Sequence, residues 1–547
     1  MTSLVSRLTS SLRNLKLSWM PVAVARSPSP SATQGPAAKR QRVETAEADA
    51  GADADKPTED PSTSASRTST ASFVSSTGKV KAKPSSPQRS FRPLPDEPTP
   101  EQLAEVEAMM ALAVEADKRD TYAYQPNYRD TLVLAPMVRS GTLPVRLLSL
   151  YHGAGLVWTP EIVDKAIIGA QRDVDTVTGV VTYHKGGGAI WTTHPIEKPF
   201  VIFQIGSSDP ELAVKAALTV AQDVSGIDLN CGCPKPFSTH SGMGAALLST
   251  PDLLLDILRA LVANVPLPIS AKIRLMPTRA ETLLLAARIL RTGISNLTVH
   301  CRTRDMRPGE KAIHARLAEV VELGRRRGLP VICNGDGEGY ANWDAIRTET
   351  GATSVMLARS AERNPSVFRP AGPLCATTML TPQLLNVASH IQNNWGNTKF
   401  LLTMFKPSPP PIGKLSKTQK KEAMECIARA KTIPDVVRNF SNMGLGEHFV
   451  VNEAVGKEFM DELKRRLEGR PEWNVWAERA KAVEDGVVVD APERTAESSA
   501  VSVASADDEE AAMNAAAVAE EEAMNAASAA PAASEEEAAN EPVRATA

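Results

Sequence analysis

Short apolar segments alternate with amphipathic segments through the middle of the chain. The apolar segments are rich in Val, Ile and Leu and are bounded by Gly, Pro or Asn, which is typical of buried strands. They lie at 131–135, 156–159, 200–205, 226–230, 268–274, 296–300, 330–333 and 354–358. Between them, apolar residues recur at helical spacing, for example in Leu212–Ala221, Pro251–Val262, Ala280–Thr292 and Ile313–Arg327. The pattern therefore predicts strands that alternate with helices.

Eight βα units in about 230 residues match the number and length expected of a parallel (β/α)₈ barrel, the TIM barrel. The pattern alone also allows an open, doubly wound sheet. A β-hairpin is expected at 179–193, where Lys185 and three glycines separate two β-like runs. Beyond Pro373 only helical patterns follow. The prediction is an α/β barrel followed by a small all-helical domain.

The two ends of the chain differ in composition from this middle part. The N-terminal part is rich in Ser, Pro, Thr and Ala and poor in aromatic residues, and the C-terminal part is rich in Ala and Glu. Such segments bury too little apolar surface to offset chain entropy. We therefore predict a disordered extension at 1–120, a barrel at 121–373, a helical domain at 374–489 and a disordered acidic tail at 490–547.

The formal net charge is −3 over 547 residues, but the charge is unevenly distributed. Residues 1–43 carry about +7, 44–130 about −6 and 490–547 about −12, which leaves about +8 for 131–489. A basic folded body suits a polyanionic partner. Within it, the lysine-rich segment 406–431 suits a phosphodiester backbone, although a solvated helix face explains that pattern equally well.

The cysteines and the N-terminus bear on the compartment. The six cysteines lie in the body without the spacing of a secreted disulfide scaffold or of a zinc site, so we expect an intracellular protein without a metal. No apolar run approaches the ~20 residues of a membrane span. The acid-free residues 1–43 resemble a mitochondrial transit peptide, whereas Lys39–Arg42 resembles a nuclear localisation signal. A cytoplasmic or nuclear protein is expected, with the mitochondrion as the alternative.

Characteristic residues, most of them polar or charged, stand at the carboxyl ends of the predicted strands, where a barrel of this kind carries its catalytic groups. They are Pro136 with Met137, Glu161, Gln204, Asn230 with Cys233, Lys272, His300 with Arg302, Asn334 with Gly335 and Asp336, and Ala358 with Arg359. Any one of them is explained as a helix cap or a surface residue, but eight in register indicate a site. The last two loops suit a phosphate. Lys272 and His300 are placed to hold the carbonyl edge of a ring such as flavin.

Cys233 lies on the loop that ends the fourth predicted strand. Gly232 and Pro234 stop the strand, and Gly242 and Gly244 permit close backbone approach to a ligand. A lone cysteine is more often an inert buried residue, but the residues around this one favour a function. With an ordinary pKa near ~8.5 the thiol is mostly protonated at neutral pH, which suits a proton donor.

In combination and order, these segments resemble the tRNA-dihydrouridine synthases, and among them the eukaryotic branch that acts on position 20 of tRNA. The matching segments are Leu134–Val138, Thr159–Asp164, Phe203–Gly206, Asn230–Lys235, Gly242–Leu247, Ala271–Arg274, His300–Arg302, Asn334–Asp336 and Ala358–Arg359. They fall within roughly residues 130–440. Cys231 and Cys301 depart from the methionine and the glycine that are often found there.

The resemblance implies an FMN-bearing barrel followed by a helical domain that binds tRNA. FMN would be bound by Pro136, Met137, Val138, Gln204, Lys272, His300, Asn334, Gly335, Asp336, Ala358 and Arg359. Asn230, Arg302 and Lys235 would contact the substrate, and Cys233 would give a proton to C5 of the uracil. The expected reaction is reduction of a D-loop uridine, U20, to 5,6-dihydrouridine with NADPH, by a monomer without a protein partner. The alternatives are a flavin-dependent dehydrogenase of free pyrimidines and a non-catalytic tRNA-binding protein.

Overall fold

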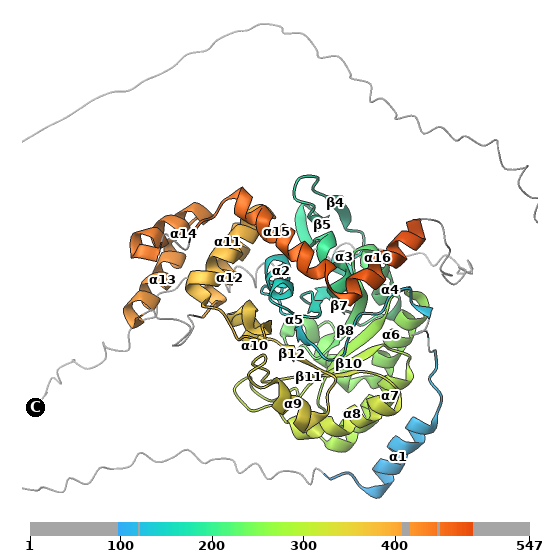
Figure 1. Cartoon of the computed structure of the whole chain (residues 1–547). Coiled ribbons are helices and arrows are strands. Elements are labelled where there is room, and N and C mark those ends of the chain that lie inside the picture. Colours follow the sequence, from blue (N-terminus) through green and yellow to red (C-terminus); the bar gives the residue numbers. More distant parts are fainter. Residues whose placement is uncertain (1–96, 117, 119–120, 407–415, 446–448, 485–547) are drawn as a thin grey trace, which may run out of the picture. The chain divides into compact units, whose positions relative to one another are not determined.

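Eight parallel strands form a closed barrel in the computed structural model, which describes residues 97–116, 118, 121–406, 416–445 and 449–484 (Figure 1). The strands are β1 (Leu132–Leu134), β2 (Val157–Trp158), β7 (Val201–Gly206), β8 (Gly226–Cys231), β9 (Ile269–Arg274), β10 (Asn296–His300), β11 (Val331–Asn334) and β12 (Ser354–Leu357). The sheet runs β2-β1-β12-β11-β10-β9-β8-β7, and β2 also pairs with β7. The predicted (β/α)₈ barrel is therefore confirmed, and an open sheet is excluded.

Helices follow the strands and cover the outside of the barrel (Figure 1). They are α2 (Leu143–Tyr151), α4 (Pro210–Val220), α6 (Pro251–Asn264), α7 (Arg279–Arg291), α8 (Leu317–Arg326), α9 (Trp343–Thr350) and the short α10 (Arg359–Arg363). Several begin where the sequence supplies a cap. The Asp209 side chain accepts the first N–H groups of α4, and Thr278 with Glu281 forms a capping box at the start of α7.

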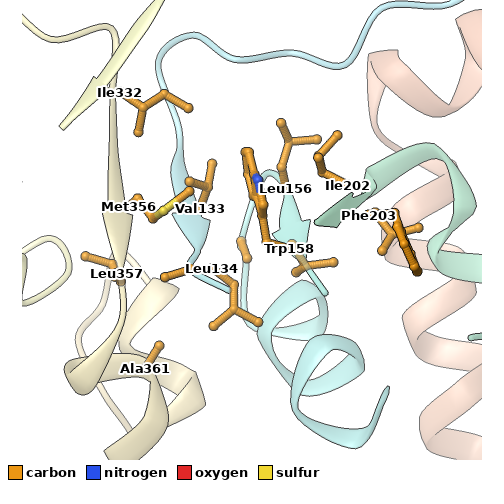
Figure 2. Close-up of a cluster of buried hydrophobic side chains, with 14 of the residues drawn as sticks. Val133, Leu134, Leu156, Trp158, Ile202, Phe203, Ile332, Met356, Leu357 and Ala361 are labelled. Atoms are coloured by element: carbon orange, nitrogen blue, oxygen red, sulfur yellow. The ribbon is translucent and has the colours of Figure 1, made fainter. Parts of the chain in front are cut away.

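The core is built from the strands and the inner faces of the helices. Figure 2 shows part of it, where Trp158 of β2 lies between side chains of β1 and β12 on one side and those of β7 on the other. Val133, Trp158 and Phe203 are fully buried. Because the barrel strands are buried on both faces, they read as continuous apolar runs, which is why the sequence pattern located them so closely.

A three-stranded antiparallel sheet is inserted between β2 and β7. The short strand β3 (Ile162–Val163) and the helix α3 (Asp164–Ile167) lead into β4 (Gln171–Val174), β5 (Val181–Lys185) and β6 (Gly188–Thr193). The expected hairpin is confirmed as β5 and β6. The sequence missed β4, because its residues are mostly exposed and polar.

The segment before the barrel is folded in part, contrary to the boundary predicted at residue 120. Helix α1 (Pro100–Ala111) packs on α7 and buries Val106 and Met110. Glu107 forms an ion pair with Arg326 on α8. The folded body therefore begins before α1. Residues 1–96 of the predicted extension and the predicted tail at 490–547 lie outside the described residues.

After the barrel the described residues form helices and no strand, as predicted. They are α11 (Thr381–His390), α12 (Trp395–Met404), α13 (Lys417–Arg429), α14 (Ile433–Phe440), α15 (Glu453–Glu468) and α16 (Pro471–Glu484). Helix α15 packs closely on α11, because a Cβ on Gly456 would lie 3.0 Å from the Asn386 carbonyl oxygen. The remaining helical elements are the four-residue α5 (Pro236–Thr239) and short 3₁₀ and π turns.

The last helix returns to the barrel, which the sequence pattern did not predict. The Trp473 ring stacks near the Phe200 ring, with centroids 6.4 Å apart. The Arg470 guanidinium donates to the carbonyl oxygens of Ala154 and Leu150 at 2.7 and 2.9 Å. The position of the boundary between barrel and helical domain, at 373, stays a prediction.

Two searches of the described residues found nothing. No helix there is both long enough and apolar enough to cross a membrane. No group of three or more His, Cys, Asp or Glu side chains in these ranges is arranged to hold a metal ion.

Candidate active site

Residues from five neighbouring strands meet at the carboxyl end of the barrel. The parallel register pairs Asn230 on β8 with Lys272 on β9, and His300 on β10 with Asn334 on β11. Asn334 pairs in turn with Met356 on β12. Residues that are distant in the sequence thus come to one mouth, as the strand-end pattern predicted.

A cavity of about 370 Å³ opens at this mouth. The predicted residues that line it are His300, Arg302, Asn334, Gly335, Asp336, Ala358 and Arg359. It is also lined by Arg274, Met306, Pro308, Gly337, Glu338, Met356, Ser360 and Arg363. Four arginines face two carboxylates, so the cavity carries an excess of positive charge. Such a cavity suits an anion.

Asp336 organises the arginines of the cavity. Arg302 and Arg359 both donate to its Oδ1, the latter at 2.7 Å, and the Ala312 N–H donates to its Oδ2 at 2.7 Å. Burial opposes ionisation of Asp336, but these donors outweigh it and lower the pKa. The carboxylate therefore fixes two guanidinium groups at the rim. Arg359 is held further by the Pro308 carbonyl oxygen at 2.7 Å.

His300 is a neutral imidazole at this site. Burial, followed by the charges of Lys272, Arg274, Arg302 and Arg359, lowers its pKa to about 2. Its Nε2 lies 3.3 Å from Nη1 of Arg302, which can only donate. Nε2 is therefore the acceptor, and Nδ1 carries the proton and serves as a donor.

Lys272 is a second group whose charge is set by its surroundings. Burial, followed by repulsion from Arg274, lowers its pKa to about 8. At neutral pH the ammonium group therefore remains mostly protonated. A cation near the barrel axis, with a donor imidazole on the next strand, suits an electron-rich ring with carbonyl oxygens.

A chain of buried amides fixes the loop that carries Cys233. Oδ1 of Asn230 accepts the N–H groups of Gly232 and Cys233 at 2.9 and 3.0 Å. Its Nδ2 donates to Gln204, which donates to Asp228 at 2.8 Å. Asn230 and Gln204 are thus engaged within the protein. Their predicted contacts with uracil and with cofactor stay predictions.

The Cys233 thiol is protonated in this environment. Burial, followed by the nearby Glu161 carboxyl, raises its pKa to about 12. It is linked electrostatically to the cavity, because the thiolate would act on both Lys272 and Arg274. A thiol that stays protonated at neutral pH is a poor nucleophile and is available as a proton donor.

The other predicted residues lie around this centre. Pro136 and Met137 are half-buried after β1, whereas Val138 is 49% exposed. Helix α12 braces this loop, because Asn397 Nδ2 donates to the Arg139 carbonyl oxygen at 2.9 Å. Lys235 is exposed at the start of α5. The roles expected for these residues stay predictions.

The sequence analysis assigned no role to Arg274, Ser360, Arg363 or Glu161. Arg274 was within reach of the pattern, because it stands two residues after Lys272 on the same strand and therefore on the same face. Ser360 and Arg363 line the cavity because α10 begins directly at its rim. Glu161 was singled out at the end of the second predicted strand but was given no role, because its surroundings come from β7 and α5.

Together, the fold and the mouth define a (β/α)₈-barrel protein with an anion-binding cavity and a protonated thiol at the carboxyl ends of its strands. Residues 133–403 match the protein family described as dihydrouridine synthase (Dus). The chain belongs to this family, since it is 43% identical over 299 residues to a curated protein of which it covers 78%.

That relative is tRNA-dihydrouridine(20) synthase [NAD(P)+] of Saccharomyces cerevisiae, and the match takes in 51% of this chain. The protein of the same name from Schizosaccharomyces pombe is 42% identical over 323 residues, which cover 57% of this chain and 65% of that protein. The match thus spans just under two thirds of the Schizosaccharomyces pombe protein. The tRNA-dihydrouridine(20a/20b) synthase [NAD(P)+]-like protein of Mus musculus is 31% identical over 43% of this chain and 68% of its own length.

Proposed function

We propose that this protein reduces a uridine of tRNA to 5,6-dihydrouridine in a flavin-dependent reaction, with NADPH as the reductant and position 20 as the target. The observation that carries the proposal is the protonated thiol of Cys233 beside the cationic mouth that contains Lys272 and His300. The names of the relatives at 42–43% identity support the choice of tRNA and of position 20.

The residues present fit flavin mononucleotide. Arg359, Arg302 and the loop at Gly335 suit its phosphate, because the cavity has more cations than carboxylates. A Cβ on Gly335 would lie 2.9 Å from the Ala312 Cβ, so the loop is closely packed there. Lys272 and Nδ1 of His300 would hold the carbonyl edge of the ring. When bound, the flavin supplies the hydride that saturates the pyrimidine.

Cys233 then acts as the acid. Hydride addition at C6 of the uracil builds negative charge in the ring, so a proton must be delivered at C5 from a group within hydrogen-bond reach. The thiol is protonated, and the Asn230 amide fixes its backbone. Cys233 does not itself line the cavity, but a charge on its sulfur would act on Lys272 and on the cavity residue Arg274, which supports a place for the thiol next to an entering base.

An RNA loop is the favoured substrate, because a uridine must leave its stack to reach this mouth and does so at least cost where it is unpaired. The exposed Lys421, Arg429 and Lys431 of the C-terminal helices suit the phosphodiester backbone. We propose that the protein acts as a monomer, in the cytoplasm or the nucleus. Both candidate targeting segments lie outside the described residues.

Mapping dihydrouridine position by position in tRNA tests the proposal. Cells that lack the protein should lose the modification at position 20, and the wild-type protein should restore it whereas Cys233→Ala should not. Full restoration by Cys233→Ala would remove this thiol from the mechanism. Faster turnover of free uridine than of tRNA would favour a pyrimidine dehydrogenase, and a purified protein without flavin would favour a non-catalytic RNA-binding role.

A further inference from the structure

Glu161 is a buried carboxyl group beside Cys233 that the proposed reaction has not yet used. It follows β2 and is only 8% exposed. Ser238 of α5 donates to its Oε1 at 2.8 Å. Its Oε2 is buried and has no hydrogen-bond partner among the described residues. Gly206 of β7 leaves room for this side chain, because a Cβ there would lie 2.8 Å from Oε1.

The pairing of Glu161 differs from that of Glu197, the other buried glutamate among the described residues. Glu197 lies in an ion pair with Arg146, at 2.7 Å. No arginine or lysine donates to Glu161, which receives only the Ser238 hydroxyl and the neighbourhood of a thiol. A buried carboxylate without a cation is costly, so the site favours the protonated form of the group. Burial accordingly raises the pKa of Glu161.

The Cys233 thiol is surrounded by few ionisable groups. Glu161 approaches it from the loop after β2, and the Ser238 hydroxyl from α5. Lys272 and Arg274 on β9 act on it from the cavity side. Gly244 keeps these parts together, because a Cβ there would lie 3.0 Å from the Cys233 Cβ and 2.3 Å from Ser238 Oγ. Among these neighbours Glu161 is the one acid.

We propose that Glu161 is the positioning residue of Cys233. Its protonated carboxyl lies beside the thiol and returns a proton to Sγ when the thiol gives its own proton to the substrate. The inference rests on the proposed function. As the S–H bond breaks and the proton goes to C5, the Glu161 O–H proton moves to Sγ, so that thiol and carboxylate remain. The carboxylate regains one proton from water before the next turnover. One solvent proton is consumed for each C5–H bond formed, and no electrons move in the exchange.

The direction of this transfer follows from the chemistry of the two groups. A thiolate is a stronger base than a carboxylate, so the proton passes from Glu161 to Sγ without an uphill step. With RNA over the mouth, the thiolate would otherwise lie in a buried site next to an electron-rich ring. Proton transfer from the Glu161 carboxyl moves that charge from the sulfur to the carboxylate.

The pairing is tested without RNA, by the rate at which iodoacetamide alkylates Cys233 in the flavin-loaded protein between pH 7 and 9. Tandem mass spectrometry assigns the site, because Cys231 lies in the same peptide. Glu161→Gln removes the negative charge of the ionised carboxyl, which disfavours the thiolate. The rate should rise by roughly tenfold for each unit by which the thiol pKa falls. A rate within twofold of wild type would overturn the pairing.

Glu362→Gln is a matched control, because Glu362 also accepts a bond from a serine, Ser140, at 2.6 Å but does not act on Cys233. Its alkylation rate should equal that of wild type. If Glu161→Gln does not fold, Glu161→Asp keeps the acid but withdraws it by one methylene. Its alkylation rate should lie above that of wild type, and an unchanged rate would overturn the proposal.

The proton replacement is tested with tRNA. Glu161→Gln should slow the single-turnover formation of dihydrouridine by at least roughly 100-fold and should leave the dissociation constant for tRNA unchanged. In wild type, ionisation of Glu161 at rising pH should lower the single-turnover rate, and Glu161→Gln should abolish this pH dependence. Faster alkylation with an unchanged single-turnover rate would overturn the proton transfer. If wild type forms no dihydrouridine, the proposed function fails, whereas the alkylation rates still decide the pairing.

Discussion

The side-chain oxygen of Asn230 accepts the backbone N–H of Cys233 at 3.0 Å. A residue near the end of the buried strand β8 therefore sets the position of the loop that carries the thiol. The same oxygen also accepts the N–H of Gly232 at 2.9 Å. Asn230 is 8% exposed and is tied to Gln204 on the neighbouring strand. The thiol therefore stands on a rigid support rather than on a free loop, which keeps an acid near its target atom.

Gly244 supplies the space for this support, and its substitution should displace the thiol. Its φ is +59°, and an added Cβ would lie 2.7 Å from the Cys233 carbonyl oxygen. Gly244→Ala should retain flavin but lose dihydrouridine formation by roughly 100-fold, as expected for a misplaced acid. Gly186→Ala is the control, since Gly186 has a φ of +60° with nothing within 4 Å of the added Cβ. Equal activity of the two variants would contradict the prediction, because it would show that the close contact of the added Cβ with Cys233 does not affect the reaction.

The sequence predicted the barrel well for a physical reason. Strands such as β7 and β8 are buried on both faces, so each appears as an apolar run with a sharp end. The exposed strand β4 carries no such signal. The docking of α16 was equally hidden, because Trp473 meets a residue that lies far from it in the sequence, Phe200.

The residues of the candidate site that stand at strand ends could be predicted from the sequence. The contacts by which one residue positions another could not. Lys272 and His300 were found because polar residues interrupt apolar runs there. The tie from Asn230 to the Cys233 backbone depends on the conformation of the loop, which no spacing in the sequence specifies. The raised pKa of Glu161 follows from its burial without a cation among the described residues around it, and that requires the packed structure.

Arg359 should contribute to retention of the flavin phosphate. Its guanidinium group is held by Asp336 and by the Pro308 carbonyl oxygen at the rim of the cavity. Arg359→Ala removes a charge-assisted donor worth about 1.5–3 kcal/mol, so the dissociation constant for FMN should rise by roughly 10- to 100-fold. Titration of FMN into the apoprotein measures it. Arg325→Ala, on the outer surface of α8, should bind FMN like wild type, and equal affinities of all three proteins would contradict the cofactor assignment.

The buried ion pair between Arg146 and Glu197 should be important for stability. The two side chains are 1% and 0% exposed and form two hydrogen bonds, at 2.9 and 2.7 Å. Arg146→Met leaves a buried carboxylate without its cation and should lower the free energy of unfolding by about 3–5 kcal/mol in urea denaturation. Arg325→Met breaks an exposed pair with Glu322 and should cost less than about 1 kcal/mol. Similar losses of unfolding free energy in the two variants would contradict the expectation that burial makes the Arg146–Glu197 pair the more costly one to break.

Lys421 on α13 should bind tRNA through charge alone. It is 80% exposed and lies 3.9 Å from Glu425, so it is free to turn toward a phosphate. Loss of one phosphate contact in Lys421→Ala should reduce the slope of log affinity against log salt concentration by about 0.7–0.9. Lys215→Ala is the matched control, since Lys215 on α4 is 60% exposed and lies 3.8 Å from Glu211. Filter-binding titrations at several salt concentrations give both slopes. The slope depends only on the cations that contact phosphate groups. Equal slopes for the two variants would therefore show that the RNA does not bind at Lys421 on α13.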